Sequence, residues 1–262
     1  MDLAADSVTR RRDFWVWRFV CTALSFALFG IGGIVLRVAV LPIVLAWPGP
    51  EPVRRRRARR TVGRAFWLHS QFMYRTGTVD IRFDGVERLG QPGQMIVANH
   101  PSLIDVVYLI GHVPEANCVV KHSLWKNPCM RGPVTAAGYI SNDGSADMLE
   151  RAAEVLREGQ TLIVFPEGTR TTPGMDPVFH RGAAAIAVRG ARIVTPVFIT
   201  VVPTTLTKAE PWYSVPNRRV RMRIRVGDDI AVADFSERAP APIASRRLNE
   251  HLHQLYAREL KA

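Results

Sequence analysis

His100 and Asp105 are the two residues of this sequence best suited to acid–base chemistry, and they lie in the run NHPSLID after an apolar stretch. An imidazole that pairs one ring nitrogen with a carboxylate keeps a fixed tautomer, and its other nitrogen becomes more basic. Such a base can take the proton of a hydroxyl that attacks a thioester carbonyl. Inside a regular helix, two residues five apart point about 140° away from each other. Pro101 favours an extended His100 and suits the first turn of a helix, so we expect His100 just outside a helix over 101–111 that contains Asp105.

A second polar segment, FPEGTR from Phe165 to Arg170, follows another apolar stretch. Polar groups at the end of a buried strand collect at the edge of an α/β sheet, where binding sites commonly form. The Arg170 guanidinium can hold a phosphate or a carboxylate through two parallel hydrogen bonds. Taken alone, the segment is also compatible with an exposed turn that carries an ion pair.

Together the two segments resemble the glycerolipid acyltransferase family of the lysophosphatidic acid type, whose first and third motifs read NHxxxxD and FPEGTR. The similarity covers residues 80–205 and includes KHSL at Lys121–Leu124 and FHRGA at Phe179–Ala183. It implies an α/β acyltransferase fold, with His100 as general base and Asp105 as its orienting partner. It further implies an acyl-CoA or acyl carrier protein donor, no metal, no cofactor and no covalent acyl-enzyme.

The resemblance also implies a substrate and the residues that bind it. The first expected acceptor is 1-acyl-sn-glycerol-3-phosphate, which acylation converts to phosphatidic acid. Gly168 would let the backbone approach the acceptor closely, and Pro196 would shape an apolar wall of the site. The full set of expected substrate-binding residues is Asn99, Lys121, Glu167, Gly168, Thr169, Arg170 and Pro196.

The second motif departs from the family pattern. Family members usually have a glycine, apolar residues and then Asp-Arg, and the arginine helps to bind the acceptor phosphate. Here Gly138–Gly144 reads GYISNDG, so Gly144 stands at the arginine position. A lost charge-assisted contact costs about 1.5–3 kcal/mol where nothing replaces it. The GYISND form resembles a bacterial subgroup linked to aryl polyene and other specialised lipid pathways. Gly144 thus favours a non-phosphate acceptor such as an ornithine lipid or an aryl polyene headgroup, whereas Arg170 favours a phosphate.

Other classes of function fit the sequence less well. A hydrolase would need Ser102 as nucleophile, but this serine lies two residues from His100 and the sequence has no GxSxG elbow. A membrane-binding protein without catalysis is a third class, and the effect of His100→Ala on acyl transfer would separate it from the enzyme classes. We expect no nucleic-acid partner, because no helix-turn-helix or RNA-recognition motif is present. The three cysteines show neither a metal-ligand spacing nor an even number for disulfides, which favours a reducing compartment.

The first 60 residues hold an apolar segment between basic clusters. Eighteen uncharged residues over Phe19–Leu36 are followed by Arg37 and a second apolar run. This run is too long for a signal peptide, and it leads into RRRRARR rather than into a cleavage site. Basic residues tend to stay on the cytoplasmic side of a membrane. The clusters Arg10–Arg12 and Arg54–Arg60 therefore favour a helical hairpin, broken near Gly30–Gly33 or Arg37, over a single span.

The charge distribution supports a membrane partner. The formal net charge is +12, and residues 1–60 hold eleven of the 35 Lys and Arg residues. Beside an anionic leaflet, each residue of the Arg54–Arg60 cluster contributes about 1 kcal/mol. We expect membrane lipids and an acyl-CoA or acidic acyl carrier protein as partners. The expected location is the bacterial inner membrane, with the active site on the cytoplasmic side.

The periodicity of the chain predicts three parts. They are an anchor with basic flanks over 1–60, an amphipathic connecting helix within 61–78, and an acyltransferase domain over 79–262. In the last part, short apolar runs alternate with helical stretches, which predicts a mixed α/β sheet flanked by helices. Four alternating arginines, Arg219, Arg221, Arg223 and Arg225, predict a half-exposed strand. They would either recruit an acidic carrier protein or protect a sheet edge from pairing.

Overall fold

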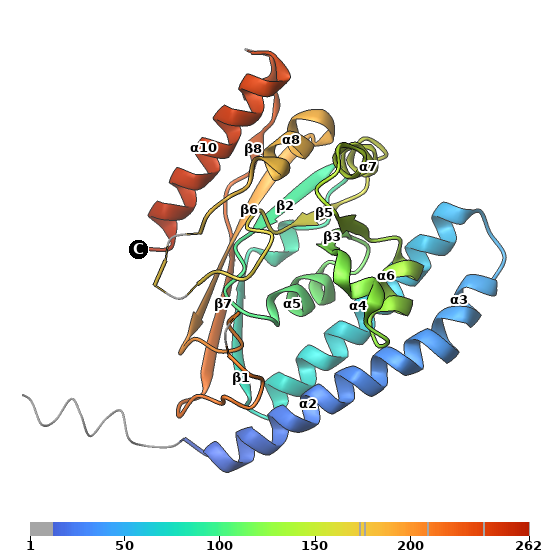
Figure 1. Cartoon of the computed structure of the whole chain (residues 1–262), viewed down its shortest axis with the longest axis vertical. Helices are drawn as coiled ribbons and strands as arrows, with labels where there is room; N and C mark the ends of the chain where they lie inside the picture. The colour runs from blue at the N-terminus through green and yellow to red at the C-terminus, as the bar shows by residue number, and fades with distance from the viewer. Residues whose placement is uncertain (1–12, 173, 176, 209, 238, 262) are drawn as a thin grey trace, which may run out of the picture.

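A mixed sheet of eight strands is formed by the described residues of the computed structural model, which are 13–172, 174–175, 177–208, 210–237 and 239–261. The strand order is β1-β7-β6-β2-β5-β3-β4, with β8 beside β6 (Figure 1). Neighbouring strands are parallel except β6–β7 and β6–β8. The strands are β1 (Val79–Asp84), β2 (Gln94–Ala98), β3 (Asn117–Lys121), β4 (Ile140–Asn142), β5 (Leu162–Val164), β6 (Ile193–Val202), β7 (Val220–Val226) and β8 (Ile230–Ala231).

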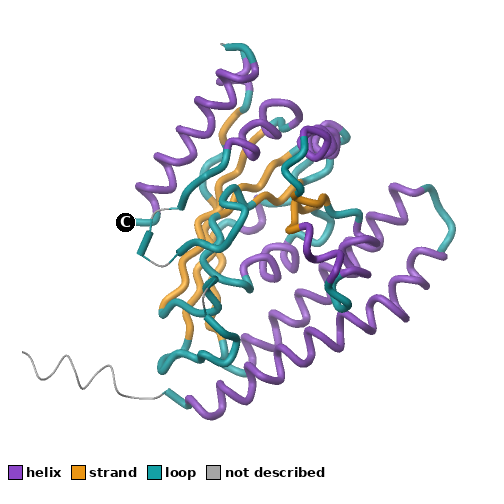
Figure 2. Tube along the Cα trace, viewed as in Figure 1, coloured by secondary structure: helices purple, strands orange, loops and turns teal. Residues whose placement is uncertain are grey.

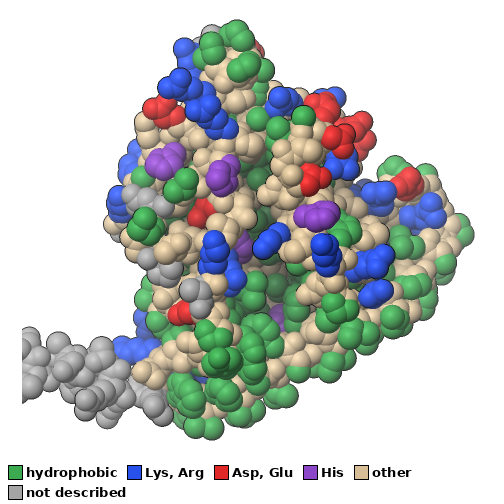
Figure 3. All heavy atoms as spheres, in the orientation of Figure 1, with side chains coloured by type: hydrophobic (Ala, Val, Ile, Leu, Met, Phe, Trp, Pro, Cys, Tyr) green, Lys and Arg blue, Asp and Glu red, His purple; other side chains and the backbone are tan. Residues whose placement is uncertain are grey.

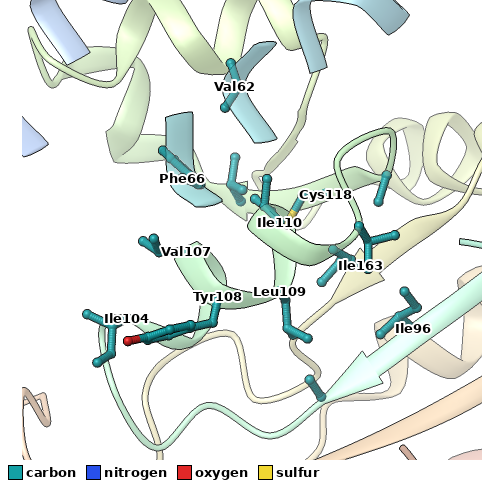
Figure 4. Close-up of a cluster of buried hydrophobic side chains, with 14 of the residues drawn as sticks. Val62, Phe66, Ile96, Ile104, Val107, Tyr108, Leu109, Ile110, Cys118 and Ile163 are labelled. Carbon is teal, nitrogen blue, oxygen red and sulfur yellow. The ribbon is translucent and has the colours of Figure 1, made fainter. Parts of the chain in front are cut away.

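Helices cover both faces of this sheet, and each face has its own hydrophobic core. Side chains of β2 alternate between the two: Ile96 and Ala98 pack towards α4 and α5, whereas Met95 and Val97 pack towards α7, α8 and α10. Figure 4 shows the first core, in which Ile96 lies near Leu109. The helices on the first side are α4 (Glu51–Arg75), α5 (Asp105–His112) and α6 (Arg131–Ala137); those on the second are α7 (Ala146–Arg157), α8 (Arg181–Gly190) and α10 (Ala241–Glu259). The short α9 (Ala233–Ser236) precedes α10.

The predicted fold class is confirmed, but the role suggested for the arginine-rich strand at the sheet edge is wrong. Strand β7 pairs with β1 on one side and with β6 on the other. Two of its arginines bind carboxylates: Arg223 lies 2.6 Å from Asp84, and Arg225 lies 2.8 Å from Glu259. Since β7 is an interior strand, its arginines have no free edge to protect.

The N-terminal region forms two antiparallel helical arms (Figures 1 and 2). The first arm runs through α2 (Trp15–Val35), a π-helical turn (Leu36–Val40) and α3 (Leu41–Ala46), and the second arm is α4. The first arm is long and apolar enough to cross a membrane. The predicted hairpin within the apolar segment, with a break near Gly30–Gly33 or Arg37, is wrong, because the helix continues to Ala46. The second arm is instead α4, which contains the Arg54–Arg60 cluster.

Close packing explains why Gly33 does not break the helix. A Cβ atom at this position would lie 2.5 Å from the carbonyl oxygen of Cys129, so glycine allows α2 to approach this segment. The chain turns instead after α3, where two prolines flank Gly49 at a φ of +145°. Tertiary contact therefore outweighs the weak helix propensity of glycine.

Helix α4 begins earlier than predicted, so the boundary drawn at residue 60 falls inside one helix. Part of the Arg54–Arg60 cluster is used within the protein rather than facing lipid. Arg59 is buried and donates to the carbonyl oxygens of Glu115 and Ala137, while Arg56 and Arg60 bind the Glu115 carboxylate. The other predicted cluster, Arg10–Arg12, lies outside the described residues.

Candidate active site

The structure brings His100 and Asp105 into contact at the carboxyl end of β2. The distance between His100 Nδ1 and Asp105 Oδ2 is 3.1 Å. The same carboxylate oxygen accepts a hydrogen bond from the backbone N–H of Ser102 at 2.8 Å. The His100 ring packs against Phe165, with ring centroids 4.6 Å apart. The predicted pair therefore has the geometry of a base and its orienting carboxylate.

The way in which Asp105 reaches His100 differs from the expectation. The helix was predicted over 101–111, but α5 starts at Asp105 itself. Pro101 and the three residues after it form a turn, and the Asp105 side chain folds back over this turn to accept the Ser102 N–H. A hydrogen bond from the Ser102 N–H to this side chain is an alternative to helical backbone pairing, so it competes with a helix that would begin at Pro101.

Burial sets the electrostatics of the pair. The Asp105 side chain has no solvent-exposed surface, whereas 16% of the His100 side chain is exposed. Burial raises the pKa of Asp105, and the hydrogen bonds from His100 and Ser102 oppose this rise. When the carboxylate is ionised, Oδ2 only accepts, so His100 Nδ1 donates to it. This tautomer leaves His100 Nε2 free to take a proton.

Glu167 connects the two motifs through backbone contacts. Its Oε1 accepts hydrogen bonds from the His100 N–H at 2.8 Å and from Thr171 Oγ1 at 2.9 Å. The Thr171 N–H in turn donates to the His100 carbonyl oxygen at 2.7 Å. Burial raises the pKa of Glu167, and the hydrogen bonds from the His100 N–H and the Thr171 hydroxyl oppose this rise. Glu167 therefore fixes the position of His100 and does not line the cavity beside this histidine.

A cavity of about 1080 Å³ opens beside His100. Its mouth is visible as the hollow in Figure 3, surrounded by Lys, Arg and His side chains. Apolar side chains from α2, α4 and α5 line its inner part, among them Phe26, Phe29, Phe66, Met73 and Val107. Four of the predicted substrate-binding residues also line it: Lys121, Gly168, Thr169 and Arg170.

Two other predicted substrate-binding residues, one directly after β2 and one in β6, do not line the cavity. Asn99 is buried, and its amide exchanges two hydrogen bonds of 2.8 Å with the backbone of Ile199 in β6. Pro196 is in β6 opposite Val97 of β2. With Glu167 they hold the strands and motifs together, so the expectation that these three residues contact substrate does not fit their positions.

Besides Arg18, whose guanidinium donates to backbone carbonyl oxygens, three cations line the cavity: Lys121, Arg170 and Lys208. Arg170 Nη1 donates to the carbonyl oxygens of Leu206 and Thr207, at 2.7 and 2.9 Å. In the described part of the chain, none of the three forms an ion pair with a carboxylate. Lys208 belongs to the loop 203–219 and was not predicted, because it stands in no motif. Its position depends on the hydrogen bonds by which Arg170 holds this loop.

Two glycines of the motifs line the same cavity. Gly144 has a φ of +75°, and no atom lies within 4 Å of the position of a Cβ there. Gly168 has a φ of +63° and ends a turn closed by its N–H and the Phe165 carbonyl. A left-handed backbone disfavours any side chain at Gly144. The site therefore has room where the family has arginine, and its backbone is shaped for glycine.

Ser102 does not have the position of a nucleophile. Its side chain is fully buried, and its hydroxyl donates to the Thr205 carbonyl oxygen at 2.9 Å. This contact ties the turn before α5 to the loop 203–219. The hydrolase alternative loses its only candidate nucleophile near His100.

Residues 80–204 match the family model described as Acyltransferase. This region belongs to the glycerolipid acyltransferase family. The acyltransferase domain is similar to "1-acyl-sn-glycerol-3-phosphate acyltransferase" of Helicobacter pylori, with 35% identity over 36% of this chain and 43% of that protein. A protein of the same name from Saccharomyces cerevisiae is 31% identical over 59% of this chain and 54% of its own length. The chain spans about half the length of the curated relatives it matches.

A solved structure shares the fold of the acyltransferase domain and of the N-terminal arms. It is the 1-acyl-sn-glycerophosphate acyltransferase from Thermotoga maritima, which matches with a TM-score of 0.66 at 20% sequence identity. The match covers 94% of this chain and 96% of that one. The fold is therefore that of a known acyltransferase structure.

Proposed function

We propose that the protein transfers a fatty acyl group from a thioester to the hydroxyl of 1-acyl-sn-glycerol-3-phosphate and so forms phosphatidic acid. The observation that carries this proposal is the contact of 3.1 Å between His100 and Asp105 at the mouth of a largely apolar cavity. His100 Nε2 takes the proton of the acceptor hydroxyl as its oxygen attacks the thioester carbonyl. Loss of the thiolate then completes the transfer, and the proton leaves His100 with it.

The cavity suits a long apolar chain. Most of the side chains that α2, α4 and α5 contribute to its wall are apolar, and they include phenylalanine, methionine and valine. Its volume, about 1080 Å³, is slightly above the usual range for ligand pockets in proteins, about 300–1,000 Å³. We propose that a lipid chain lies here while its reactive group is held at His100. The donor would be acyl-CoA or an acyl carrier protein, with no metal or other cofactor.

The cations of the cavity favour an anionic acceptor. Lys121, Arg170 and Lys208 line it without carboxylate partners among the described residues, so they are available to a phosphate. These three cations supply positive charge to the cavity, whereas Gly144, at the position of the family's arginine, supplies none. Lysophosphatidic acid therefore remains the first proposed acceptor. The open space at Gly144 favours the second candidate, a non-phosphate acceptor such as an ornithine lipid or an aryl polyene headgroup.

A membrane location follows from the first helical arm. It is apolar over most of its length, and only 17% of its most apolar stretch is buried in the protein. Such a surface fits membrane association. We propose the inner membrane of a bacterium, with the cavity open to the cytoplasmic side, where both donors are made.

A panel of substrates tests this proposal. Detergent-purified protein is incubated with acyl-CoA or acyl carrier protein donors and with lysophosphatidic acid, lyso-ornithine lipid or an uncharged lysolipid. Formation of phosphatidic acid at the highest kcat/KM supports the first acceptor. Transfer only to an amino-acid or uncharged headgroup would move the assignment to the second candidate, and no transfer from any donor would contradict both.

A further inference from the structure

One part of the cavity is polar, although aromatic side chains surround it. Between α2 and α4, Ser25 Oγ lies 3.1 Å from His69 Nε2, and Thr22 stands one turn before Ser25. All three residues line the cavity that contains His100. The ring of Phe29 meets the His69 ring edge-on, with centroids 5.3 Å apart. We call Thr22, Ser25 and His69 the polar niche.

The polar niche has hydrogen-bonding capacity that the protein does not use. A neutral imidazole has one donor and one acceptor nitrogen, and Ser25 engages only Nε2 of His69. Within the described residues, no side chain or carbonyl pairs with His69 Nδ1 or with the Thr22 hydroxyl. Polar groups in an apolar cavity are unfavourable unless something hydrogen-bonds to them. The niche is therefore matched to a ligand that brings a polar group to this depth.

The polar group that fits the niche carries no charge. Burial lowers the pKa of His69 to about 4, so its ring is neutral at physiological pH. Arg18 also lines the cavity, but its guanidinium already donates to four backbone carbonyl oxygens, those of Asp13, Pro216, Asn217 and Arg218. Neither residue offers a free positive charge to an anion. A hydroxyl group, which both donates and accepts, satisfies the niche best.

We infer that the cavity selects a lipid chain that carries a hydroxyl group, held by Ser25 and His69. The inference rests on the proposed function, because the chain enters as part of the acyl donor or of the lysolipid acceptor. A plain saturated chain would leave the niche unpaired, whereas a hydroxylated chain of the same length pairs with it. Sites built to hydrogen-bond a hydroxyl discriminate strongly against analogues that lack it.

The test compares matched chains in the full-length protein. One series of thioester donors carries a single hydroxyl that moves along the chain, and a second series places it in the chain of the lysolipid acceptor. We expect one position to raise kcat/KM about tenfold over the plain chain, in the donor series or in the acceptor series. Ser25→Ala and His69→Phe should remove this advantage, so that within each variant kcat/KM for the hydroxylated chain falls to that for the plain chain. Ser70→Ala is the control, since this buried serine of α4 donates to Trp67 and does not line the cavity.

Equal rates for plain and hydroxylated chains at every position would overturn the inference, as would an advantage that survives Ser25→Ala. Absence of transfer from all chains would instead contradict the proposed function. In that case the niche is tested by binding, with calorimetry on a saturated fatty acid and on the same acid with one mid-chain hydroxyl. Tighter binding of the hydroxylated acid that is lost in Ser25→Ala supports the niche, and equal binding rejects it.

Discussion

Asp105 combines two opposing properties at the scale of a single residue. Its burial raises its pKa, which disfavours the charged carboxylate, while the base function of His100 requires that carboxylate to be ionised. The hydrogen bonds from His100 Nδ1 and from the Ser102 N–H favour the ionised form. Folding therefore holds this charge at a cost in stability, as is common at catalytic sites.

Replacing Asp105 by asparagine should separate activity from stability. We expect Asp105→Asn to lower kcat for acyl transfer by about 10³- to 10⁴-fold, because an amide no longer fixes the tautomer of His100. The melting temperature at neutral pH should stay unchanged or rise, because the variant buries no charge. Steady-state kinetics and circular dichroism melts check both effects. Retained activity, or a clear loss of stability, would contradict the role given to this carboxylate.

The pH dependence of the same variant follows from the raised pKa. Between the ordinary carboxyl pKa and its raised value, the folded wild type binds more protons than the unfolded chain. The free energy of unfolding of the wild type should therefore rise relative to Asp105→Asn as the pH falls through the raised pKa. Urea unfolding at several pH values measures this difference, and the opposite trend would show that the pKa is lowered by folding.

Lys208 is the residue whose role depends most on the fold of a loop. If it contacts the acceptor phosphate, Lys208→Ala should raise KM for lysophosphatidic acid tenfold or more, since charged hydrogen bonds contribute about 1.5–3 kcal/mol. KM for an uncharged acceptor should change little. Lys126→Ala is the control, because Lys126 is exposed and does not line the cavity. An equal effect on both acceptors would remove Lys208 from phosphate recognition.

At the scale of elements, the helical arm of residues 15–46 is positioned by close backbone contact. Gly33 touches the segment around Cys129, whereas Gly32 has no atom within 4 Å of its Cβ position. We expect Gly33→Ala to lower the free energy of unfolding by about 1–3 kcal/mol through overpacking. Gly32→Ala should raise it by up to about 1 kcal/mol, because alanine favours the helix. Denaturant unfolding in detergent compares the two, and equal effects would contradict this packing.

The elements that the sequence predicted best are those with a strong periodic pattern. The alternating arginines of 219–226 and the apolar run before His100 both became strands, β7 and β2. Strand β4 was not predicted, because only one of its three residues is apolar, whereas the equally short β5 is a continuous apolar run. The break predicted near Gly30–Gly33 or Arg37 is absent, and the sequence could not show why, because the contact of Gly33 with Cys129 joins residues that lie far apart in the sequence.

Site residues could be predicted where their type and motif indicate a role. They could not be predicted where only their position in the fold gives them one. His100 and Arg170 line one cavity, and Asp105 contacts His100, as expected from their types and motifs. Glu167 stands in the same motif as Arg170, yet its carboxylate turns to the backbone of His100. Lys208 is the opposite case: it lines the cavity but belongs to no motif, so the sequence did not mark it. The loop 203–219 brings it to the cavity.

At the scale of the whole molecule, apolar side chains gather on one side. They lie along α2, at the bottom of the view in Figure 3, and include the exposed residues Leu24, Leu28 and Ile31. The opposite side carries α10, and most of the exposed residues of this helix are polar. This distribution suits a protein that rests on or enters a membrane with its first arm.

Binding to lipid vesicles tests this surface. The wild type should co-sediment with vesicles, and a triple variant with Leu24, Leu28 and Ile31 each replaced by serine should lose most of this binding. Ile243→Ser removes an exposed apolar residue from α10 and should leave binding unchanged. High salt should weaken only the extra binding to anionic vesicles, because apolar insertion is not screened. Unchanged binding of the triple variant would show that α2 is not the membrane contact.

The rate of acyl transfer by His100→Ala tests the central claim most directly. The variant should keep the fold, since one side of the His100 ring faces the cavity, and should still bind the lysolipid acceptor. With His100 as the general base, its kcat should fall by at least about 10²-fold, in line with the usual contribution of such a base. Acyl transfer by folded His100→Ala at the wild-type rate would contradict the mechanism.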